Sequence, residues 1–495
     1  MNFLKVFHSI PKLLILAALL TPALAQNNPV PQVVGPVHPD AVAPGGGDFT
    51  FSVYGANFIP GSVVNWNYQP RTTTFVSAHE IRAQILASDI SHNTAGYITV
   101  TNPAPGGGSS SASWAQVEVH EPISTIVMGA PEYNLLSWLA EAADVYHNTK
   151  LDLLGLYDGL VLYPNEANGT FESWSFVDPH YLGGPYQFAY GDFNNDGNLD
   201  VAAASSLGSD YGSNPTRMDV MLGNGAGTFI AGTPILSHED NLNDVLVGDF
   251  NQDGNLDLIT EGVSYLTEYL GNGDGTFRLS VRYPYPAYGL AVQTVAGDFN
   301  GDGKLDLLLL QAPYLSFNNN SRPGMAFWFM QGNGDGTFQP ITEVASFPGA
   351  DVCGGGAYSG TSLQVSDFNG DGNLDIAFCN KSQIGVMLGN GDGTFQSPNF
   401  YTADFTNRGM YTFAVGDINA DGKPDLLVSE YPGDYGNTFV VFLGNGDGTF
   451  QAPRTVGLAQ VPNPETGITV GDFNSDGLLD FGFRSDVGMD VFLQQ

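Results

Sequence analysis

Positively charged residues are scarce in this chain. Its 15 Lys and Arg residues stand against 51 Asp and Glu residues, which gives a formal net charge of −36, and the basic residues form no cluster. Nucleic acids and anionic membranes are bound largely through Lys and Arg, because these side chains replace the counterions of the phosphates. The composition therefore excludes nucleic acid and anionic lipid surfaces as partners.

Long apolar runs are also rare. The clearest is Leu13 to Leu20, which follows Lys5 and Lys12 and precedes the small residues Ala23 to Ala25. It is shorter than the roughly 20 residues that a membrane-spanning helix needs, and its flanks are typical of a secretory signal peptide. We therefore expect residues 1–25 to be removed on export. The mature protein should be a monomer without a membrane span that is secreted, periplasmic or at the cell surface.

Cysteine is the third scarce residue, since only Cys353 and Cys379 occur in the chain. In an oxidising compartment they could form a disulfide bond or remain two unpaired thiols, and the sequence leaves both open. With 495 residues the chain can bury a large core and does not depend on disulfides for its stability.

Glycine, in contrast, is abundant, with 63 residues, and aromatic residues make up 12% of the chain. Charged residues account for only 13% and hydrophobic residues for 42%, which is too apolar for a disordered acidic chain. We expect a turn-rich, all-β protein of more than one domain.

Residues 26–120 form the first domain that we expect, because they lack the aspartate motif described below. Turn residues separate five short runs of β-forming residues, at 48–55, 62–68, 80–86, 96–102 and 114–119. This spacing is typical of a small β-sandwich.

Three stretches of that segment also carry a family resemblance: YGANFIPGSVVNW, TTTFVSAHEIRAQILASDI and GYITVTNPAPGGGSS. They resemble the IPT/TIG family of immunoglobulin-like domains over nearly the whole segment. The resemblance implies an Ig-like sandwich that acts as a spacer or interaction module without catalysis.

Residues 121–495 repeat a turn of the form D-x-N-x-D-G-x-x-D. Its six full copies begin at Asp192, Asp249, Asp298, Asp367, Asp417 and Asp472, and a worn copy, DVYHNTKLD, spans 144–152. Short apolar strands surround each copy, and a unit of about 50 residues with four strands is typical of a β-propeller blade. Seven units predict a seven-bladed β-propeller that follows the small Ig-like sandwich.

Each full turn places oxygen-bearing side chains at positions one, three, five and nine, and glycine at position six allows the sharp bend. Position seven can offer its backbone carbonyl, so the donors are all oxygen atoms and suit calcium. The bidentate glutamate of an EF-hand is absent at position twelve, so position nine must supply that carboxylate. Asp and Asn also form side-chain turns without a metal, but three carboxylates in one turn repel one another unless a cation lies between them.

We therefore predict about six Ca²⁺ sites, one in each full turn. Tyr146 and Asn148 replace two oxygen-rich positions of the worn copy, which disfavours calcium there. The candidate metal residues at positions one, three, five, seven and nine are Asp192, Asn194, Asp196, Asn198, Asp200, Asp249, Asn251, Asp253, Asn255, Asp257, Asp298, Asn300, Asp302, Lys304, Asp306, Asp367, Asn369, Asp371, Asn373, Asp375, Asp417, Asn419, Asp421, Lys423, Asp425, Asp472, Asn474, Asp476, Leu478 and Asp480.

With these turns, residues 121–495 resemble the FG-GAP/VCBS repeat proteins, whose calcium-loop propeller also forms the head of integrin α chains. The resemblance implies the propeller and its calcium loops. It is specific for this architecture and not for one function.

A second signature, LGNGDGTF, recurs at 270–277, 388–395 and 443–450, with variants that begin at 222 and 331. Its glycine spacing differs from the G-x-G-x-x-G of nucleotide-binding turns, and no helix follows that could bind a phosphate. We expect a hairpin turn whose phenylalanine anchors the blade, on the same face as the aspartate turns.

The loops expected at the other face vary from unit to unit and are rich in tyrosine. Recognition often lies in loops on a rigid scaffold, and tyrosine offers a sugar or a protein both a flat ring and a hydroxyl. The alternative is that these rings only pack against one another. The candidate ligand-binding residues are Tyr211, Tyr283, Tyr285, Tyr288, Tyr314, Tyr358, Tyr431 and Tyr435.

The leading hypothesis is a secreted, calcium-stabilised binding or adhesion protein for an extracellular glycan or protein, with no catalytic residues, because no catalytic motif occurs. One alternative is a polysaccharide lyase or glycosidase on the same scaffold, with a carboxylate pair drawn from loop acids. Another is a purely structural surface protein. The loop acids are Asp210, Glu239, Asp240, Asp351, Glu430 and Asp434.

The last unit ends the chain without an outer strand of its own. An open sheet edge has to be covered. We expect the apolar stretch Ile123 to Gly129 to complete that unit and so to join the two ends of the propeller.

Overall fold

The structure is a computed structural model. In the part of the chain that it describes, all regular elements are β-strands, so the protein is all-β. The structure describes residues 27–33, 37–110, 115–129, 133–135, 140–157, 159–166, 168–172, 175–177, 185–206, 216–236, 242–262, 265–285, 291–311, 324–350, 362–380, 383–403, 410–430, 439–456, 468–485 and 488–495. The predicted signal peptide, residues 1–25, lies outside these ranges. Within them, no helix has the length and apolar character needed to cross a bilayer.

Two sheets form most of an N-terminal unit, residues 27–119. One has the strand order β1-β3-β7-β6, and the other has the order β2-β10-β8-β4-β5, with β9 paired to β8. The bounds are β1 Gln32–Val33, β2 Ala41–Val42, β3 Phe49–Ala56, β4 Val63–Trp66, β5 Gln69–Pro70, β6 Thr73–Phe75, β7 Glu80–Ile85, β8 Thr94–Asn102, β9 Gly108–Ser109 and β10 Gln116–Val119. The five strands expected from the sequence are therefore confirmed.

The core of this unit lies between its two sheets. Along β7 the side chains alternate between buried and exposed, as expected for a strand with one face in the core. Phe51 and Ile81 of one sheet pack with Trp66, Val100 and Val117 of the other in one apolar cluster.

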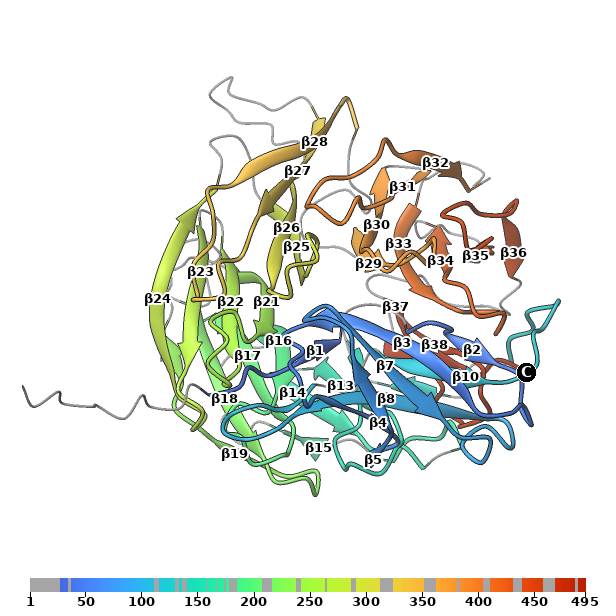
Figure 1. The fold of residues 1–495 in the computed structure, drawn as a ribbon, viewed down its shortest axis with the longest axis horizontal. Coiled ribbons are helices and arrows are strands. Elements are labelled where there is room, and N and C mark those ends of the chain that lie inside the picture. Colours follow the sequence, from blue (N-terminus) through green and yellow to red (C-terminus); the bar gives the residue numbers. More distant parts are fainter. Residues whose placement is uncertain are drawn as a thin grey trace, which may run out of the picture.

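From residue 133 on, the described strands form seven sheets that lie around a common centre (Figure 1). We call these seven sheets the ring. The first three are β12 Ala140–Ala143, β13 Asp152–Tyr157, β14 Gly159–Tyr163 and β15 Ser175–Phe176; β16 Pro185–Gly191, β17 Asp200–Ser206, β18 Thr216–Gly223 and β19 Phe229–Ala231, with β20 Ile235–Leu236; and β21 Leu242–Gly248, β22 Asp257–Gly262, β23 Tyr265–Gly271 and β24 Phe277–Pro284.

The other four sheets continue the same order. They are β25 Ala291–Gly297, β26 Asp306–Gln311, β27 Gly324–Met330 and β28 Thr342–Pro348; β29 Leu363–Ser366, β30 Asp375–Asn380, β31 Gln383–Met387 and β32 Asn399–Thr402; β33 Met410–Gly416, β34 Asp425–Glu430, β35 Phe439–Phe442 and β36 Arg454–Val456; and β37 Ile468–Gly471, β38 Asp480–Ser485 and β39 Gly488–Phe492 with β11 Tyr133–Leu135.

Neighbouring sheets of the ring pack through their first strands. Contacts run in chain order from β16 to β21, β25, β29, β33 and β37, and β37 also contacts β12 of the first sheet. The second strands are covered on both faces, so β22 and β26 are buried along their whole length. β26 has four consecutive leucines, whereas β22 also buries Asp257, Thr260 and Glu261.

The segment before the first sheet completes the last one. β11 pairs antiparallel with the C-terminal strand β39, and Met128 forms a bridge with Gln494. The N–H of Gly129 donates to the carbonyl of Leu493 at 2.8 Å. The predicted joining of the two ends is confirmed, although the regular strand lies beyond residues 123–129.

Cys379 lies in β30, is fully buried and is disulfide-bonded. The sequence had left open a disulfide or two thiols, and the structure decides for the disulfide. Cys353, the other cysteine of the chain, lies outside the described residues.

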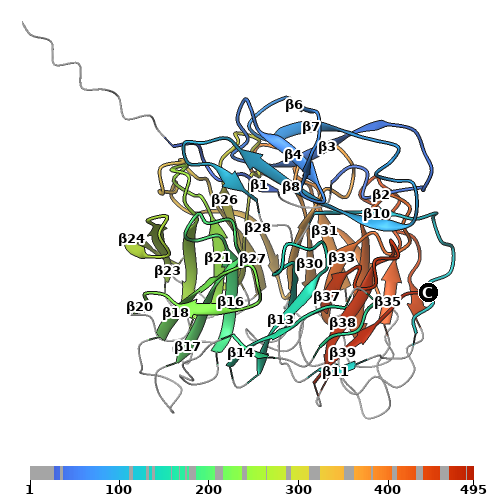
Figure 2. The same ribbon diagram turned by 90° about the horizontal axis from the view of Figure 1, so that it is seen from below.

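The N-terminal unit lies across one face of the ring (Figure 2). In the first six sheets the first two strands, and also the last two, are joined at this face, while the second and third strands are joined at the opposite one, because the four strands form an antiparallel meander. In the last sheet β37 and β38 are joined at this face, and the fourth strand, β11, comes from the segment before the first sheet. We call the two ends the turn face and the far face.

Candidate metal centres

The aspartate turns lie at the turn face, between the first and second strands of a sheet. In the third turn, residues 298–306, the carboxylate of Asp298 accepts the N–H of Asp302 at 3.1 Å and that of Gly303 at 2.7 Å. Asn300 Oδ1 accepts the N–H of Asp302 at 2.9 Å, and Asp302 Oδ1 accepts the N–H of Lys304 at 3.0 Å. The side chains thus fold the backbone around themselves.

Position nine anchors the turn to the sheet. Asp306 accepts the N–H of Phe299 on one oxygen at 3.2 Å and the N–H of Gly332, after the third strand, on the other at 2.8 Å. A Cβ on Gly332 would lie 2.0 Å from the carbonyl oxygen of Leu305, so only glycine allows this approach. This contact explains why the second signature has glycine as its second residue, at the end of the third strand.

The six full turns share this frame. Their first aspartates accept the N–H groups of positions five and six. Their ninth aspartates accept the N–H of position two and one from the end of the third strand. The glycine at position six has a positive φ in every copy, for example 80° at Gly303, which confirms why glycine is needed there.

Burial makes these carboxylates costly to ionise. The ninth-position aspartates are fully buried, and burial together with neighbouring carboxylates raises the pKa of Asp306 to about 8 and that of Asp257 to about 9. Burial likewise raises the pKa of the first-position residues Asp249 and Asp472 to about 7, although backbone N–H groups oppose the shift. These carboxyl groups are therefore harder to ionise in the folded protein than in water.

The turn residues fit a calcium ion by their chemistry. The donors are oxygen atoms only, and a carboxylate oxygen that accepts one N–H keeps a second lone pair for a cation. In the described residues, however, no three His, Cys, Asp or Glu side chains already converge as a metal-binding group. The same hydrogen bonds also form side-chain turns without a metal, so the calcium sites remain a prediction.

Where position seven is Leu or Lys, the side chain is not suited to bind a cation, so only the backbone carbonyl could be a ligand. Leu478 is 4% exposed and packs against Ala41 and Ala420, so its side chain cannot be a ligand, whereas its carbonyl can. Lys304 and Lys423 place Nζ 4.0 Å and 3.6 Å from the position-five carboxylates of their own turns. These two turns therefore carry some compensating charge already.

The worn turn has the same hydrogen bonds to its first and ninth aspartates, although its residues at positions three and five differ from those of the full turns. Asp144 accepts the N–H groups of Asn148 and Thr149, and Asp152 accepts those of Val145 and Asn165. Thr149 stands at position six with a φ of 67°, a conformation that a β-branched residue adopts only at a cost.

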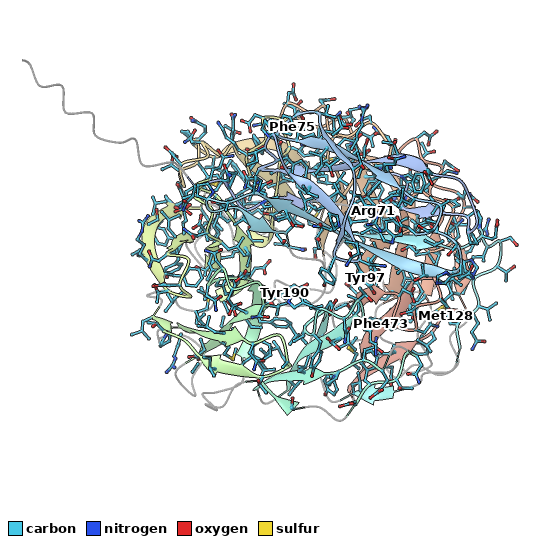
Figure 3. The ribbon with its side chains drawn as sticks, turned by 60° about the horizontal axis from the view of Figure 1, so that its bottom comes forward. Arg71, Phe75, Tyr97, Met128, Tyr190 and Phe473 are labelled. Carbon is cyan, nitrogen blue, oxygen red and sulfur yellow. The ribbon has the colours of Figure 1, made fainter. Side chains whose placement is uncertain are left out.

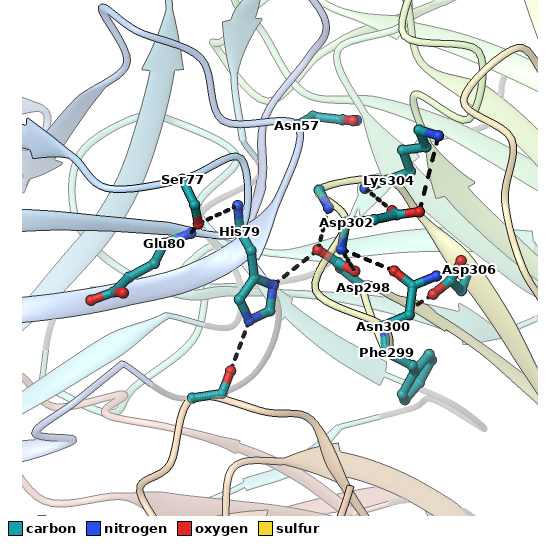
Figure 4. A network of polar contacts seen from close by, with 12 residues as sticks. Asn57, Ser77, His79, Glu80, Asp298, Phe299, Asn300, Asp302, Lys304 and Asp306 are labelled. Atoms are coloured by element: carbon teal, nitrogen blue, oxygen red, sulfur yellow. Dashed lines mark hydrogen bonds and ion pairs between the residues drawn. The ribbon is translucent and has the colours of Figure 1, made fainter. Parts of the chain in front are cut away.

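The N-terminal unit contacts the first aspartates of four turns. Tyr68 donates its hydroxyl to Asp144 at 2.7 Å, and the N–H of Val30 donates to Asp249 at 2.7 Å. His79 Nδ1 lies 3.0 Å from Asp298 Oδ2, while its Nε2 donates to the carbonyl of Gly372 in the next turn at 2.7 Å (Figure 4). His38 Nε2 lies 3.1 Å from Asp367 Oδ2, in an ion-pair contact that lacks hydrogen-bond alignment.

These contacts change the acidity of the groups involved. Burial lowers the pKa of His79, but its bonds to Asp298 and Gly372 outweigh burial, and the net shift is upward. Burial raises the pKa of Asp367, but His38 and the backbone N–H groups outweigh it, and the net shift is downward.

Apolar contacts accompany the polar ones. Tyr97 of β8 packs in one cluster with Phe473 of the sixth turn, and Figure 3 shows the two rings at the border of the two units. Ala56 joins the cluster around Phe250 of the second turn. No local sequence pattern indicated these contacts, because the partners are 194 residues apart for Ala56 and Phe250 and 376 residues apart for Tyr97 and Phe473.

At the fifth turn the N-terminal unit places the acidic residues Asp40 and Glu118 near the turn, and not hydrogen-bond donors as at the other turns that it contacts. Asp40 and Glu118 are each 3% exposed. Burial, followed by the charges of Asp417 and Asp367, raises the pKa of Asp40, and burial, followed by Asp417 and Asp40, raises that of Glu118.

A second group of carboxylates lies toward the far face. Asp244 of β21 pairs directly with Glu261 of β22, near the strand ends that are remote from the aspartate turn. Burial and the charge of Asp244 raise the pKa of Glu261 and of Glu141 in β12 to about 8 each. Glu261 Oε2 accepts the hydroxyl of Thr294 at 2.7 Å, whereas its Oε1 has no hydrogen-bond partner among the described residues. The sequence-based predictions did not include Asp244, Glu261 and Glu141, although acidic residues between apolar residues of a strand can indicate a functional site.

The predicted ligand-binding tyrosines are described only in part. Tyr283 lies in β24 and not in a loop, packs edge-on against Phe338 and accepts its N–H at 3.1 Å, so its placement in a loop was wrong. Tyr285 follows that strand and packs on the same apolar cluster. Tyr211, Tyr288, Tyr314, Tyr358, Tyr431 and Tyr435 lie outside the described residues, as do the loop acids apart from Glu430 at the end of β34.

The comparison with protein families finds an FG-GAP-like repeat at residues 144–203, 262–309, 367–428 and 431–483. The first of these segments begins at the worn turn. No curated protein matches the chain.

Solved structures that resemble the fold include one on the recognition of non-reducing terminal N-acetylglucosamine by an Agrocybe aegerita lectin, with 17% identity, a TM-score of 0.46 and coverage of 74% of this chain and 90% of that chain. An auxiliary nutrient binding protein from Bacteroides ovatus has 11% identity, a TM-score of 0.39 and coverage of 94% and 98%. The periplasmic gluconolactonase of Pseudomonas aeruginosa has 13% identity, a TM-score of 0.41 and coverage of 79% and 95%. Likeness at this level identifies neither a ligand nor an activity, and the chain is an all-β protein with four FG-GAP-like repeats.

Proposed function

We propose that the protein is an exported, calcium-stabilised binding protein that recognises an extracellular glycan or protein at the far face of the ring. In this proposal the seven sheets are the blades of a β-propeller, and the N-terminal unit is an Ig-like domain fixed to the turn face. The signal peptide predicted at residues 1–25 would direct the protein out of the cytoplasm.

The observation that carries the proposal is the position of the N-terminal unit. It contacts the first aspartates of four turns through Tyr68, Val30, His79 and His38. A large ligand would have to displace this unit to reach the turn face. The far face, where the second and third strands of each sheet are joined, is the remaining end of the ring for recognition.

Calcium would be held by positions one, three, five and nine of the full turns, together with the carbonyl of position seven. When bound, it would supply positive charge to carboxylates that burial makes costly to ionise. The turns themselves fix the first and second strands of each sheet relative to the third. Their role is thus to stabilise the scaffold that carries the recognition surface.

The acids near the far face support a ligand rich in hydroxyl groups. Asp244 and Glu141 are partly exposed and come from different sheets, and the charge of Asp244 acts on Glu141, whereas Glu261, the strand partner of Asp244, is buried. Carboxylates accept hydrogen bonds from sugar hydroxyls. This chemistry favours a glycan over an apolar ligand.

The experiment is an array of glycans and matrix proteins, probed with the purified protein in calcium and in EDTA. We expect binding that the double variant Asp244→Asn/Glu141→Gln weakens at least about tenfold, while Glu121→Gln, an exposed acid on the turn side, leaves it unchanged. The proposal fails if no ligand binds in calcium, or if the far-face variant binds as well as the unchanged protein.

A polysaccharide-active enzyme is the second candidate, because an acid that stays protonated near neutral pH can act as a general acid. Burial raises the pKa of Asp244 to about 7, and its neighbours Glu141 and Glu261 lie higher still. Turnover of a glycan panel, followed by new reducing ends or unsaturated products, tests this candidate. Activity that Asp244→Asn abolishes would favour the enzyme over the binding protein.

A further inference from the structure

The fifth turn differs from the other full turns in one hydrogen bond. In the others, the position-five carboxylate accepts the N–H of position seven at 2.8 to 3.0 Å. In the fifth turn, Asp421 Oδ1 is buried and has no hydrogen-bond partner within the described residues. One carboxylate oxygen of this turn is therefore unsatisfied.

Asp40 of the N-terminal unit lies directly over this turn. A Cβ on Gly422 would be 3.4 Å from the carbonyl oxygen of Ala41 and 3.6 Å from Cβ of Pro39, so residues 39–41 rest on the turn glycine. Asp40 is 3% exposed, and neither of its carboxylate oxygens has a hydrogen-bond partner in the described part of the chain.

Glu118 adds a third acid from the neighbouring strand. β2 and β10 pair in parallel, and the N–H of Glu118 donates to the carbonyl of Asp40 at 2.9 Å. Glu118 is also 3% exposed, and among the described residues its Oε2 has no partner. Three carboxylates from two units thus have unsatisfied oxygens in the same region.

Two states could satisfy a buried carboxylate: protonation or a cation. A carboxyl group can share a proton with a neighbouring carboxylate, whereas one cation can be bound by oxygen atoms of several carboxylates at once. At four other turns the N-terminal unit supplies hydroxyl, backbone or imidazole groups to the first aspartate, but here it supplies oxygen atoms. Oxygen atoms from several carboxylates are the ligands that calcium prefers.

We propose that a calcium ion joins the N-terminal unit to the ring at the fifth turn, with Asp40 and Glu118 as ligands from one unit and Asp421 from the other. The proposal rests on calcium binding by the aspartate turns and adds a ligand pair that lies outside them. No three such groups yet converge within the described residues, so the ion has to draw Asp40 and Asp421 together. Calcium would then stabilise the contact between the units as well as the ring.

The test compares Asp40→Asn and Glu118→Gln with the unchanged protein and with Glu121→Gln, an exposed acid three residues from Glu118. Calcium binding is measured by titration calorimetry, and the melting temperature is measured in calcium and in EDTA. We expect each interface variant to lose one site, or to weaken it at least about tenfold, while the other sites remain. We also expect Asp40→Asn to melt at the same temperature as the unchanged protein or higher in EDTA, and lower in calcium.

This reversal separates a ligand from a packing residue, because a packing defect would lower the melting temperature equally in both conditions. Equal losses in calcium and EDTA, or a calcium titration identical to that of the unchanged protein, would overturn the bridging site. If the unchanged protein binds no calcium at all, the proposed calcium turns fail, and the bridge fails with them. Binding in the unchanged protein that is undiminished in both interface variants refutes the bridge alone.

Discussion

The worn turn at 144–152 and the third full turn at 298–306 have the same pattern of hydrogen bonds from backbone N–H groups to the first and ninth aspartates. They differ in the residues at the middle positions of the turn. Both fold around two terminal aspartates, which accept backbone N–H groups in the same order. Where the full turn has Asn300 and Asp302, the worn turn has Tyr146 and Asn148.

The comparison separates two roles that the motif combines. The terminal aspartates and the backbone make the shape, and the worn turn makes it without the middle carboxylate. The middle residues add oxygen atoms and negative charge, which the shape does not need. Calcium binding should therefore depend on the middle of the turn, and folding on its ends.

The largest effect should come from removing calcium from the full turns together. Each site contributes on the order of 1 kcal/mol at a few times its dissociation constant, and several sites add up. We expect EDTA to lower the melting temperature clearly and calcium to restore it, as measured by calorimetry. A melting curve that is the same in EDTA and in calcium would show that the full turns, like the worn turn, are not stabilised by calcium.

The next largest effect concerns pH in EDTA. Burial raises the pKa of Asp306 and of Asp375 to about 8, far above the ordinary value of 3.8. The folded protein therefore keeps protons that the unfolded chain has released, so stability falls as the pH rises from about 4 to about 8. Denaturant unfolding at several pH values should show this fall in EDTA and a much weaker one in calcium. Equal slopes in both conditions would contradict it.

The terminal aspartates should matter equally in both kinds of turn. Asp306→Ala and Asp152→Ala each leave two buried N–H groups without their acceptor, which should cost about 2–4 kcal/mol even in EDTA. Urea unfolding measures the cost, with Asp302→Ala as the control that should change little without calcium. A cost confined to Asp306→Ala would show that the worn turn has lost its structural role.

Rebuilding the worn turn should add one calcium site. The triple variant Tyr146→Asn/Asn148→Asp/Thr149→Gly restores the middle ligands and the glycine at the positive φ of position six. We expect titration calorimetry to find one more bound calcium ion and calcium to stabilise the variant by about 1 kcal/mol more than the unchanged protein. Thr149→Gly alone is the control, and it should not change the number of ions.

The smallest effect concerns the lysines at position seven. Lys304 and Lys423 lie near the position-five carboxylates and oppose a cation there. Replacing either with Met should tighten calcium binding at that turn about threefold, since the charges are partly exposed and screened. Lys150→Met in the worn turn should have no such effect in the same titration.

Much of the fold could be predicted from the sequence, because its signals are local. Runs of β-forming residues between turn residues marked β3 and β7, and the short apolar segments beside each aspartate turn marked strands such as β26. The aspartate turns could be recognised because the hydrogen bonds that shape each turn lie mostly within nine residues. The placement of Tyr283 in a loop was wrong, because a loop and a strand end look alike where both carry Tyr and Pro.

The sequence by itself determined the strands, the turns and their spacing, since these depend on side chains and backbone groups that are close along the chain. The tertiary structure alone decided that the N-terminal unit lies on the turn face, that His79 meets Asp298 and that Asp40 is buried over the fifth turn. These contacts join residues roughly 200 to 400 positions apart. They depend on the fit of two folded surfaces, which no local pattern encodes.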